Sequence, residues 1–188
     1  FLGLGSALVM LGVAYNTEAA REFAAKVARA MRDEAYLASI DLAKERGAFP
    51  ALDVERYLAS GFARRLPKEV RHAIREHGIR NSHLLSIAPT GTISLAFADN
   101  ASNGIEPAFS WSYFRKKRQP DGGWQEYQVV DHAYRLYGHL GYDTGDLPRA
   151  FVTALQMKAL DHLLLVKAVQ PYIAAAIPQT GNVPEDYT

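Results

Sequence analysis

Apolar residues at helical spacing mark the longest element that the sequence predicts. They recur between Thr17 and Gly47, with charged residues on the other side, at Phe23, Val27, Met31, Ala35 and Ala38. This is the pattern of an amphipathic helix. Thr17 is a good N-cap residue and Gly47 a typical stop signal. We therefore predict one long helix over residues 18–46.

Other stretches of the chain carry weaker helical patterns. Residues 1–15 are almost entirely apolar. A membrane span needs about 20 such residues and no basic segment precedes them, so we predict a buried core helix there. Helical patterns also cover residues 67–78, 130–140 and 150–176, whereas residues 50–66 look irregular.

Two strand-like runs, 109–118 and 124–130, flank the turn sequence Q-P-D-G-G and predict a β-hairpin near 109–130. Arg115 to Arg118 form a basic cluster at the end of the first run. Aromatic residues before such a cluster occur in nucleic-acid-binding proteins. A single patch in a chain of net charge +1 is more typical of a strand end that blocks edge pairing. We expect neither nucleic acid nor a membrane surface as partner.

Composition places the chain among ordinary globular proteins. Of its 188 residues 48% are apolar and 22% charged, which suits a single domain over residues 1–188. The sequence contains no cysteine, which excludes disulfides, thiolate metal sites and a cysteine nucleophile in this chain. Its six histidines show no metal-ligand spacing, so we expect no metal site. Because secretory features are absent, we expect a cytoplasmic protein.

The segment S-I-A-P-T-G-T-I-S at residues 86–94 has an unusual order of residue types. The apolar run 84–88 has the length of a buried strand, and Pro89 ends it. Residues 90–98 have the composition of a short helix. The sequence therefore predicts a strand, a tight turn and a helix start in direct succession.

Such a turn can bind an anion, because the first amides of a helix have no acceptor and glycine lets a ligand approach the backbone. Thr90, Thr92 and Ser94 would add hydroxyl donors. An alternative interpretation stays open, in which Thr90 only caps the helix and Gly91 only permits the turn.

Three segments carry a resemblance to a known family: R-N-S-H-L-L-S-I-A-P-T-G-T-I-S (80–94), S-N-G-I-E-P-A-F (102–109) and N-V-P-E-D-Y (182–187). In this order they resemble adenosylcobalamin-dependent, class II ribonucleotide reductase, in the C-terminal part of its catalytic barrel. The resemblance implies a helix-rich, partial α/β barrel from an enzyme that converts ribonucleotides to deoxyribonucleotides. It also implies that the substrate phosphates are bound by Pro89, Thr90, Gly91, Thr92, Ile93 and Ser94.

The same resemblance implies parts that this chain lacks. The family's reactive cysteines lie mainly upstream of the matching stretch, so we expect no catalytic residue here. Adenosylcobalamin is implied for the complete enzyme and is expected not to bind this chain alone. We expect a chain cut at both ends, with apolar surface left uncovered. In place of the family's usual sequence stands P-Q-T-G at 178–181, where proline and glycine weaken a strand.

Two functions follow as alternatives. The chain is either a portion of a reductase that supplies the phosphate loop, or a non-catalytic, reductase-derived nucleotide-binding or interaction module. In the first case its partners are the ribonucleotide and the cysteine-bearing remainder of the reductase, or further copies of the chain.

Overall fold

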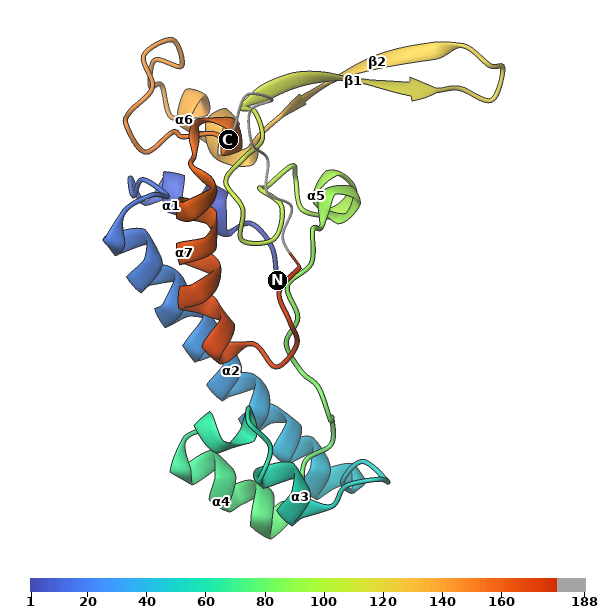
Figure 1. The fold of residues 1–188 in the computed structure, drawn as a ribbon. Coiled ribbons are helices and arrows are strands. Elements are labelled where there is room, and N and C mark those ends of the chain that lie inside the picture. Colours follow the sequence, from blue (N-terminus) through green and yellow to red (C-terminus); the bar gives the residue numbers. More distant parts are fainter. Residues whose placement is uncertain (179–188) are drawn as a thin grey trace. The chain divides into compact units, whose positions relative to one another are not determined.

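The computed structural model describes residues 1–178, and its contacts divide them into two units (Figure 1). Unit 1 comprises Phe1–Arg21, Ile87–Leu165 and Pro178, and unit 2 comprises Glu22–Ser86 and Val166–Ile177. The α-helices are α1 (Leu4–Met10), α2 (Glu18–Arg46), α3 (Val54–Leu58), α4 (Lys68–His77), α5 (Gly91–Phe97), α6 (His132–His139) and α7 (Ala159–Val169). The strands are β1 (Ser112–Arg118) and β2 (Trp124–Val130), and short 3₁₀-helices lie at Ala63–Arg65, Ala154–Gln156 and Gln170–Tyr172.

Helix α2 has the predicted bounds. The Thr17 hydroxyl accepts a hydrogen bond from the Ala20 amide at 3.3 Å, and the helix ends before Gly47, whose φ is +79°. The observed buried face differs from the predicted one: Ala38 is exposed, and the apolar residues of α2 that become fully buried are Ala20, Ala24, Ala28, Tyr36 and Ile40. Alanines let neighbouring backbones come close, so the small side chains take the buried side and Phe23, Val27 and Met31 stay half-buried.

Unit 2 has a core made by α2, α3 and α4. Its buried members are Tyr36, Ile40, Leu58, Ala63, Leu66, Val70, Ile74 and Ile79. Helix α4 fills most of the predicted range 67–78. The expectation that residues 50–66 are irregular was wrong for α3, which begins at an N-cap, Asp53, whose carboxylate accepts from the Arg56 amide at 3.0 Å.

Unit 1 contains the predicted hairpin and the predicted N-terminal core helix, α1. Strands β1 and β2 pair antiparallel from Ser112↔Val130 to Arg118↔Trp124, and β2 leads directly into α6 (Figure 1). Phe151 packs between Trp111 and Tyr137, with ring centroids 5.0 Å away on each side. Helix α7 is shorter than the predicted range 150–176: a separate 3₁₀-helix, Ala154–Gln156, precedes it, and Pro171 lies in the 3₁₀-helix that follows it.

Several large apolar side chains of unit 1 are exposed, as expected for a partial barrel: Met10, Leu11, Phe97, Leu140 and Tyr142. No helix in the described part of the chain is long and apolar enough to cross a membrane. The predictions for residues 179–188, including the N-V-P-E-D-Y segment and most of P-Q-T-G, lie outside the described residues.

Candidate functional site

The chain before the candidate loop is extended but is not a strand. Residues 83–90 have no ladder partner within residues 1–178, so the strand predicted over 84–88 was wrong. Within it, Ile87 is buried between exposed Ser86 and Ala88. A strand needs a neighbour for its N–H and C=O groups, and the sequence of one segment does not supply that neighbour.

Thr90 joins the loop to the segment that follows α5. Its hydroxyl accepts a hydrogen bond from the Gly104 amide at 3.0 Å and makes no capping bond to α5. Gly104 has φ +45°, and a Cβ there would lie 2.9 Å from the Ala88 carbonyl oxygen. Thr90 is the N-cap residue of α5, but its side chain makes no capping bond to the helix and instead fixes the 88–90 backbone against residue 104.

Three amides at the start of α5 have no hydrogen-bond acceptor within the described residues. The first α5 amide to find a carbonyl is that of Ser94, which donates to Thr90 at 2.8 Å. The preceding N–H groups belong to Gly91, Thr92 and Ile93. Gly91 is not needed for a left-handed turn, since its φ is not positive, and a Cβ would meet only Asn103 Nδ2, at 3.6 Å. The interpretation of Gly91 as only permitting the turn is not supported by this geometry.

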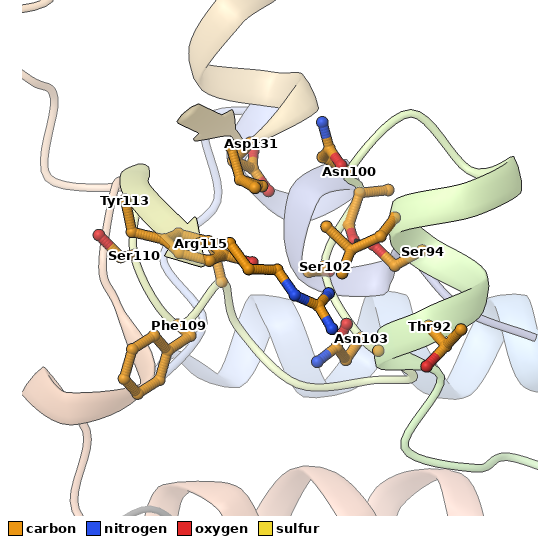
Figure 2. A pocket seen from close by; sticks show the side chains of 15 residues that line it. Thr92, Ser94, Asn100, Ser102, Asn103, Phe109, Ser110, Tyr113, Arg115 and Asp131 are labelled. Atoms are coloured by element: carbon orange, nitrogen blue, oxygen red, sulfur yellow. Dashed lines mark hydrogen bonds between the residues drawn. The ribbon is translucent and has the colours of Figure 1, made fainter. Parts of the chain in front are cut away.

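A pocket of about 310 Å³ is lined by two of these three residues, Gly91 and Thr92. Its lining includes Gly91 and Thr92 from α5, Ser102 and Asn103 from the following segment, and Arg115 from β1. Figure 2 shows the Arg115 side chain extending from β1 across the pocket toward Asn103. The pocket thus combines amide, hydroxyl and guanidinium donors, which is the chemistry of an anion site.

The six predicted loop residues have different positions in this site. Gly91, Thr92 and Ser94 line the pocket. The Ser94 side chain is buried and its hydroxyl donates to the Ala101 carbonyl. Pro89 lines a neighbouring cavity of about 270 Å³, and the Ile93 side chain is half-exposed. Thr92 is therefore the predicted residue whose hydroxyl stays available to a ligand.

A buried polar network holds the pocket wall. Ser6 of α1 accepts from the Ser102 amide at 2.7 Å, and the Ser6 amide donates to the Ser102 hydroxyl at 3.0 Å. The Ser6 hydroxyl donates to Asp131 at 3.0 Å, and the other carboxylate oxygen of Asp131 caps α6 by accepting from the Ala133 and Tyr134 amides. Burial raises the pKa of Asp131, and these hydrogen bonds partly offset the rise. Sequence reasoning missed this network, which joins residues more than 90 positions apart.

Sequence reasoning also missed Arg115 as a pocket residue. The chain has no Lys or Arg between Arg80 and Arg115, so the cation nearest to the loop in the pocket comes from the hairpin. The strand register, which sets Arg115 on the pocket side with Tyr113 and Val129, was the signal that could have found it.

Comparisons with known proteins agree with the resemblance seen in the sequence. The family model "Ribonucleotide reductase, barrel domain" matches residues 1–188. A vitamin B12-dependent ribonucleoside-diphosphate reductase of Mycobacterium tuberculosis is 32% identical over 203 residues, which cover 100% of this chain and 27% of the relative. A relative of the same name from Thermoplasma acidophilum is 28% identical, over 100% of this chain and 24% of its own length.

A ribonucleoside-diphosphate reductase large chain of Encephalitozoon cuniculi is 29% identical over 84% of this chain and 20% of its own length. The chain thus spans about a quarter of the length of the curated relatives that it matches across its whole extent. Its helices and hairpin are those of a partial α/β barrel. The chain belongs to the ribonucleotide reductase barrel-domain family.

Proposed function

We propose that this chain is the part of a vitamin B12-dependent ribonucleotide reductase that holds the phosphates of the ribonucleotide substrate. Its phosphate loop consists of Pro89, Thr90, Gly91, Thr92, Ile93 and Ser94. The observation that carries the proposal is the run of three α5 amides without acceptors, two of which belong to residues that line a pocket with further donors. An anion with several oxygens satisfies such donors together.

Four of the six loop residues have distinct roles in the proposed site. Thr90 fixes the backbone through Gly104, so the amides are held in place before a ligand arrives. Gly91 carries no side chain toward Asn103 and leaves its amide open. Thr92 supplies a hydroxyl donor, and Ser94 anchors the end of the first turn through Ala101.

The complete enzyme, as we propose it, converts ribonucleotides to deoxyribonucleotides. Its thiols come from a cysteine-bearing remainder of the reductase, because none of the 188 residues is a cysteine. Adenosylcobalamin supplies radical chemistry when it is bound. The pocket of about 310 Å³ beside α5 is far too small for a corrinoid, so we assign none of its lining residues to that group.

Phosphate binding by the chain alone should be weak. About three hydrogen bonds to a charged group contribute roughly 1.5 to 3 kcal/mol each. Association costs at least about 4 kcal/mol in lost freedom. At most a few kcal/mol of binding free energy remain, which corresponds to a dissociation constant of about a millimolar or weaker.

Titration of the 188-residue chain with a nucleoside diphosphate, followed by backbone amide shifts, tests the proposal. We expect the largest shifts at Gly91, Thr92 and Ile93, and we expect Gly91→Val to remove them by placing a branched side chain beside the amides. Gly61→Val is the matched control, since a Cβ at Gly61 meets nothing within 4 Å and this residue lines none of the pockets described here.

Saturable shifts centred elsewhere would refute the phosphate loop. Addition of adenosylcobalamin and a dithiol should produce no deoxynucleotide, because the chain holds no thiol. Loop shifts together with failure of any cysteine-bearing reductase segment to restore turnover would favour the alternative, a non-catalytic nucleotide-binding module.

A further inference from the structure

We propose that Asn103 is a site of spontaneous deamidation and that the Thr90 hydroxyl holds this reaction in check. Asn103 and Gly104 form the one Asn-Gly pair among the 188 residues. Asparagine is a thermally labile residue, most of all before glycine, which has no side chain to hinder attack of its backbone nitrogen on the carboxamide. The inference goes beyond the proposed function, because it concerns the covalent chemistry of the chain itself and needs no ligand.

The reaction consumes only water and uses a base from the solvent. The Gly104 nitrogen gives its proton to that base and attacks Cγ of Asn103. A C–N bond forms, the bond between Cγ and Nδ2 breaks, and Nδ2 leaves as ammonia after taking up one proton. Water then opens the cyclic imide at either of its carbonyls, which yields aspartate or isoaspartate at position 103.

The fold requires glycine at position 104. Its φ of +45° lies in the left-handed region, and a Cβ there would lie 2.9 Å from the Ala88 carbonyl oxygen and 3.5 Å from Ile87 Cγ2. A backbone carbonyl cannot turn away as the end of a flexible side chain can, so glycine is the residue that fits. The packing of residue 104 against the 87–88 segment therefore places the most reactive neighbour next to Asn103.

The Asn103 carboxamide is free to react. Among residues 1–178 its side chain makes no hydrogen bond. It is half-buried and lines two cavities, of about 310 and 270 Å³. Figure 2 shows it among the side chains around the larger one. Water and base can therefore reach Cγ, and no hydrogen bond fixes the torsion of the side chain.

The attacking nitrogen, in contrast, is held. The Gly104 N–H donates to Thr90 Oγ1 at 3.0 Å, so the proton that must leave is engaged by Thr90. The peptide is fixed on both sides as well: the Asn103 carbonyl accepts from the Glu106 amide at 2.9 Å, and the Gly104 carbonyl accepts from the Leu4 amide at 3.4 Å. Because the Gly104 nitrogen is the group that attacks Cγ, the Thr90 hydroxyl acts on the reaction directly.

The modification cannot reverse itself. Isoaspartate adds a methylene to the backbone between Asn103 and Gly104, which shifts Gly104 relative to Thr90 and breaks the geometry of the protecting hydrogen bond. Aspartate keeps the backbone, but either product places a carboxylate in the lining of both cavities where an amide stood. Thr90 thus sets the lifetime of the native loop.

The test follows deamidation of the 188-residue chain during storage in mildly alkaline buffer. Trypsin releases residues 81–115 as one peptide, because no Lys or Arg lies inside it. Mass spectrometry of this peptide gives the rate at Asn103 and, as internal references, at Asn81 and Asn100. We expect Asn103 to react more slowly in the folded wild type than in urea. Thr90→Val should raise the folded-state rate about two- to tenfold, the factor for the loss of one neutral hydrogen bond.

Two further variants separate the hydroxyl from other effects of the substitution. Thr90→Ser keeps a hydroxyl and should react at the wild-type rate. Thr144→Val is the control, because it removes a hydroxyl of unit 1 that makes no hydrogen bond within residues 1–178 and lines neither cavity. It should leave the rate at Asn103 unchanged. In urea all four chains should react alike, since they differ only in the folded state.

A second measurement needs no variant. As urea rises below the unfolding transition of the wild type, hydrogen exchange of the Gly104 amide and deamidation of Asn103 should accelerate by the same factor, because both need the N–H released from Thr90. This measurement decides if Thr90→Val loses its fold. Unequal factors would overturn the inference. So would a wild-type rate as fast when folded as in urea, a folded Thr90→Val no faster than the wild type, or Thr90→Ser as fast as Thr90→Val.

Discussion

Replacing Gly5 by alanine should break the packing that holds the pocket wall. A Cβ at this position would lie 2.2 Å from the Glu106 carbonyl oxygen, 2.8 Å from Pro107 Cα and 2.8 Å from Ser102 Oγ. Two of these atoms are backbone, and a rotamer change cannot move backbone out of the way. Helix α1 would have to shift by about 1 Å or more to restore an ordinary contact distance.

The cost of this shift follows from what α1 holds. Overpacking of a buried site costs about 1 to 3 kcal/mol. The reciprocal hydrogen bonds between Ser6 and Ser102, at 3.0 and 2.7 Å, contribute about 1 kcal/mol each and would be stretched. Alanine gains about 1 kcal/mol of helix propensity over glycine. The net loss is about 2 to 4 kcal/mol in the free energy of unfolding of unit 1.

Urea unfolding followed by tryptophan fluorescence measures this loss, because both tryptophans, Trp111 and Trp124, lie in unit 1. Hydrogen exchange at the Ser6 and Ser102 amides should accelerate together. Gly61→Ala is the control, since its Cβ meets nothing within 4 Å, and we expect a change within about 0.5 kcal/mol. Gly5→Ala with unchanged stability and unchanged exchange would refute the packing argument.

Two further predictions concern carboxylates of unit 1. Burial raises the pKa of Asp131 above its ordinary 3.8, so its contribution to stability is full below the unfolded value and is lost as the pH rises through the folded value. Asp131→Asn should therefore make the urea midpoint depend less on pH above about pH 4. A midpoint that falls with rising pH as steeply as in the wild type would contradict this. Hydrogen bonds from His132 and Arg135 lower the pKa of Asp99, so its contribution is present above the ordinary 3.8 and is lost as the pH falls through the lowered value. Asp99→Asn should remove this part of the loss of stability at low pH. The urea midpoint measured below about pH 4 checks it, and a pH dependence there equal to that of the wild type would contradict it.

Elements whose ends are set by capping or turn residues close by in the chain could be predicted from the sequence. Thr17 and Gly47 fix the ends of α2 through groups within four residues of each end. The turn residues between β1 and β2 set the hairpin without help from elsewhere. The same kind of signal, Asp53 before an apolar residue, was present for α3 and was overlooked among residues that looked irregular.

The remaining features depend on partners far along the chain. Whether 84–88 forms a ladder depends on a neighbouring strand that the segment itself does not encode. The basic cluster was interpreted as protection of a strand edge, because its sequence alone does not say which of four consecutive cations faces a pocket. The contact of the Thr90 hydroxyl could not be predicted for a similar reason: it accepts a hydrogen bond from the amide of Gly104, 14 residues away.

The pairing of Ser6 with Ser102 and Asp131 has a consequence for synthesis on the ribosome. Helix α1 has seven residues, too few to be stable alone, and its hydrogen-bond partners follow 96 and 125 residues later. At about 5 to 20 residues per second, the apolar residues of α1 wait roughly 6 to 25 s for Asp131 to emerge. The hydrophobic cluster formed by α2, α3 and α4 lies within residues 36–84 and can assemble during that wait. Nascent chains should therefore expose α1 to chaperones while this cluster is already packed.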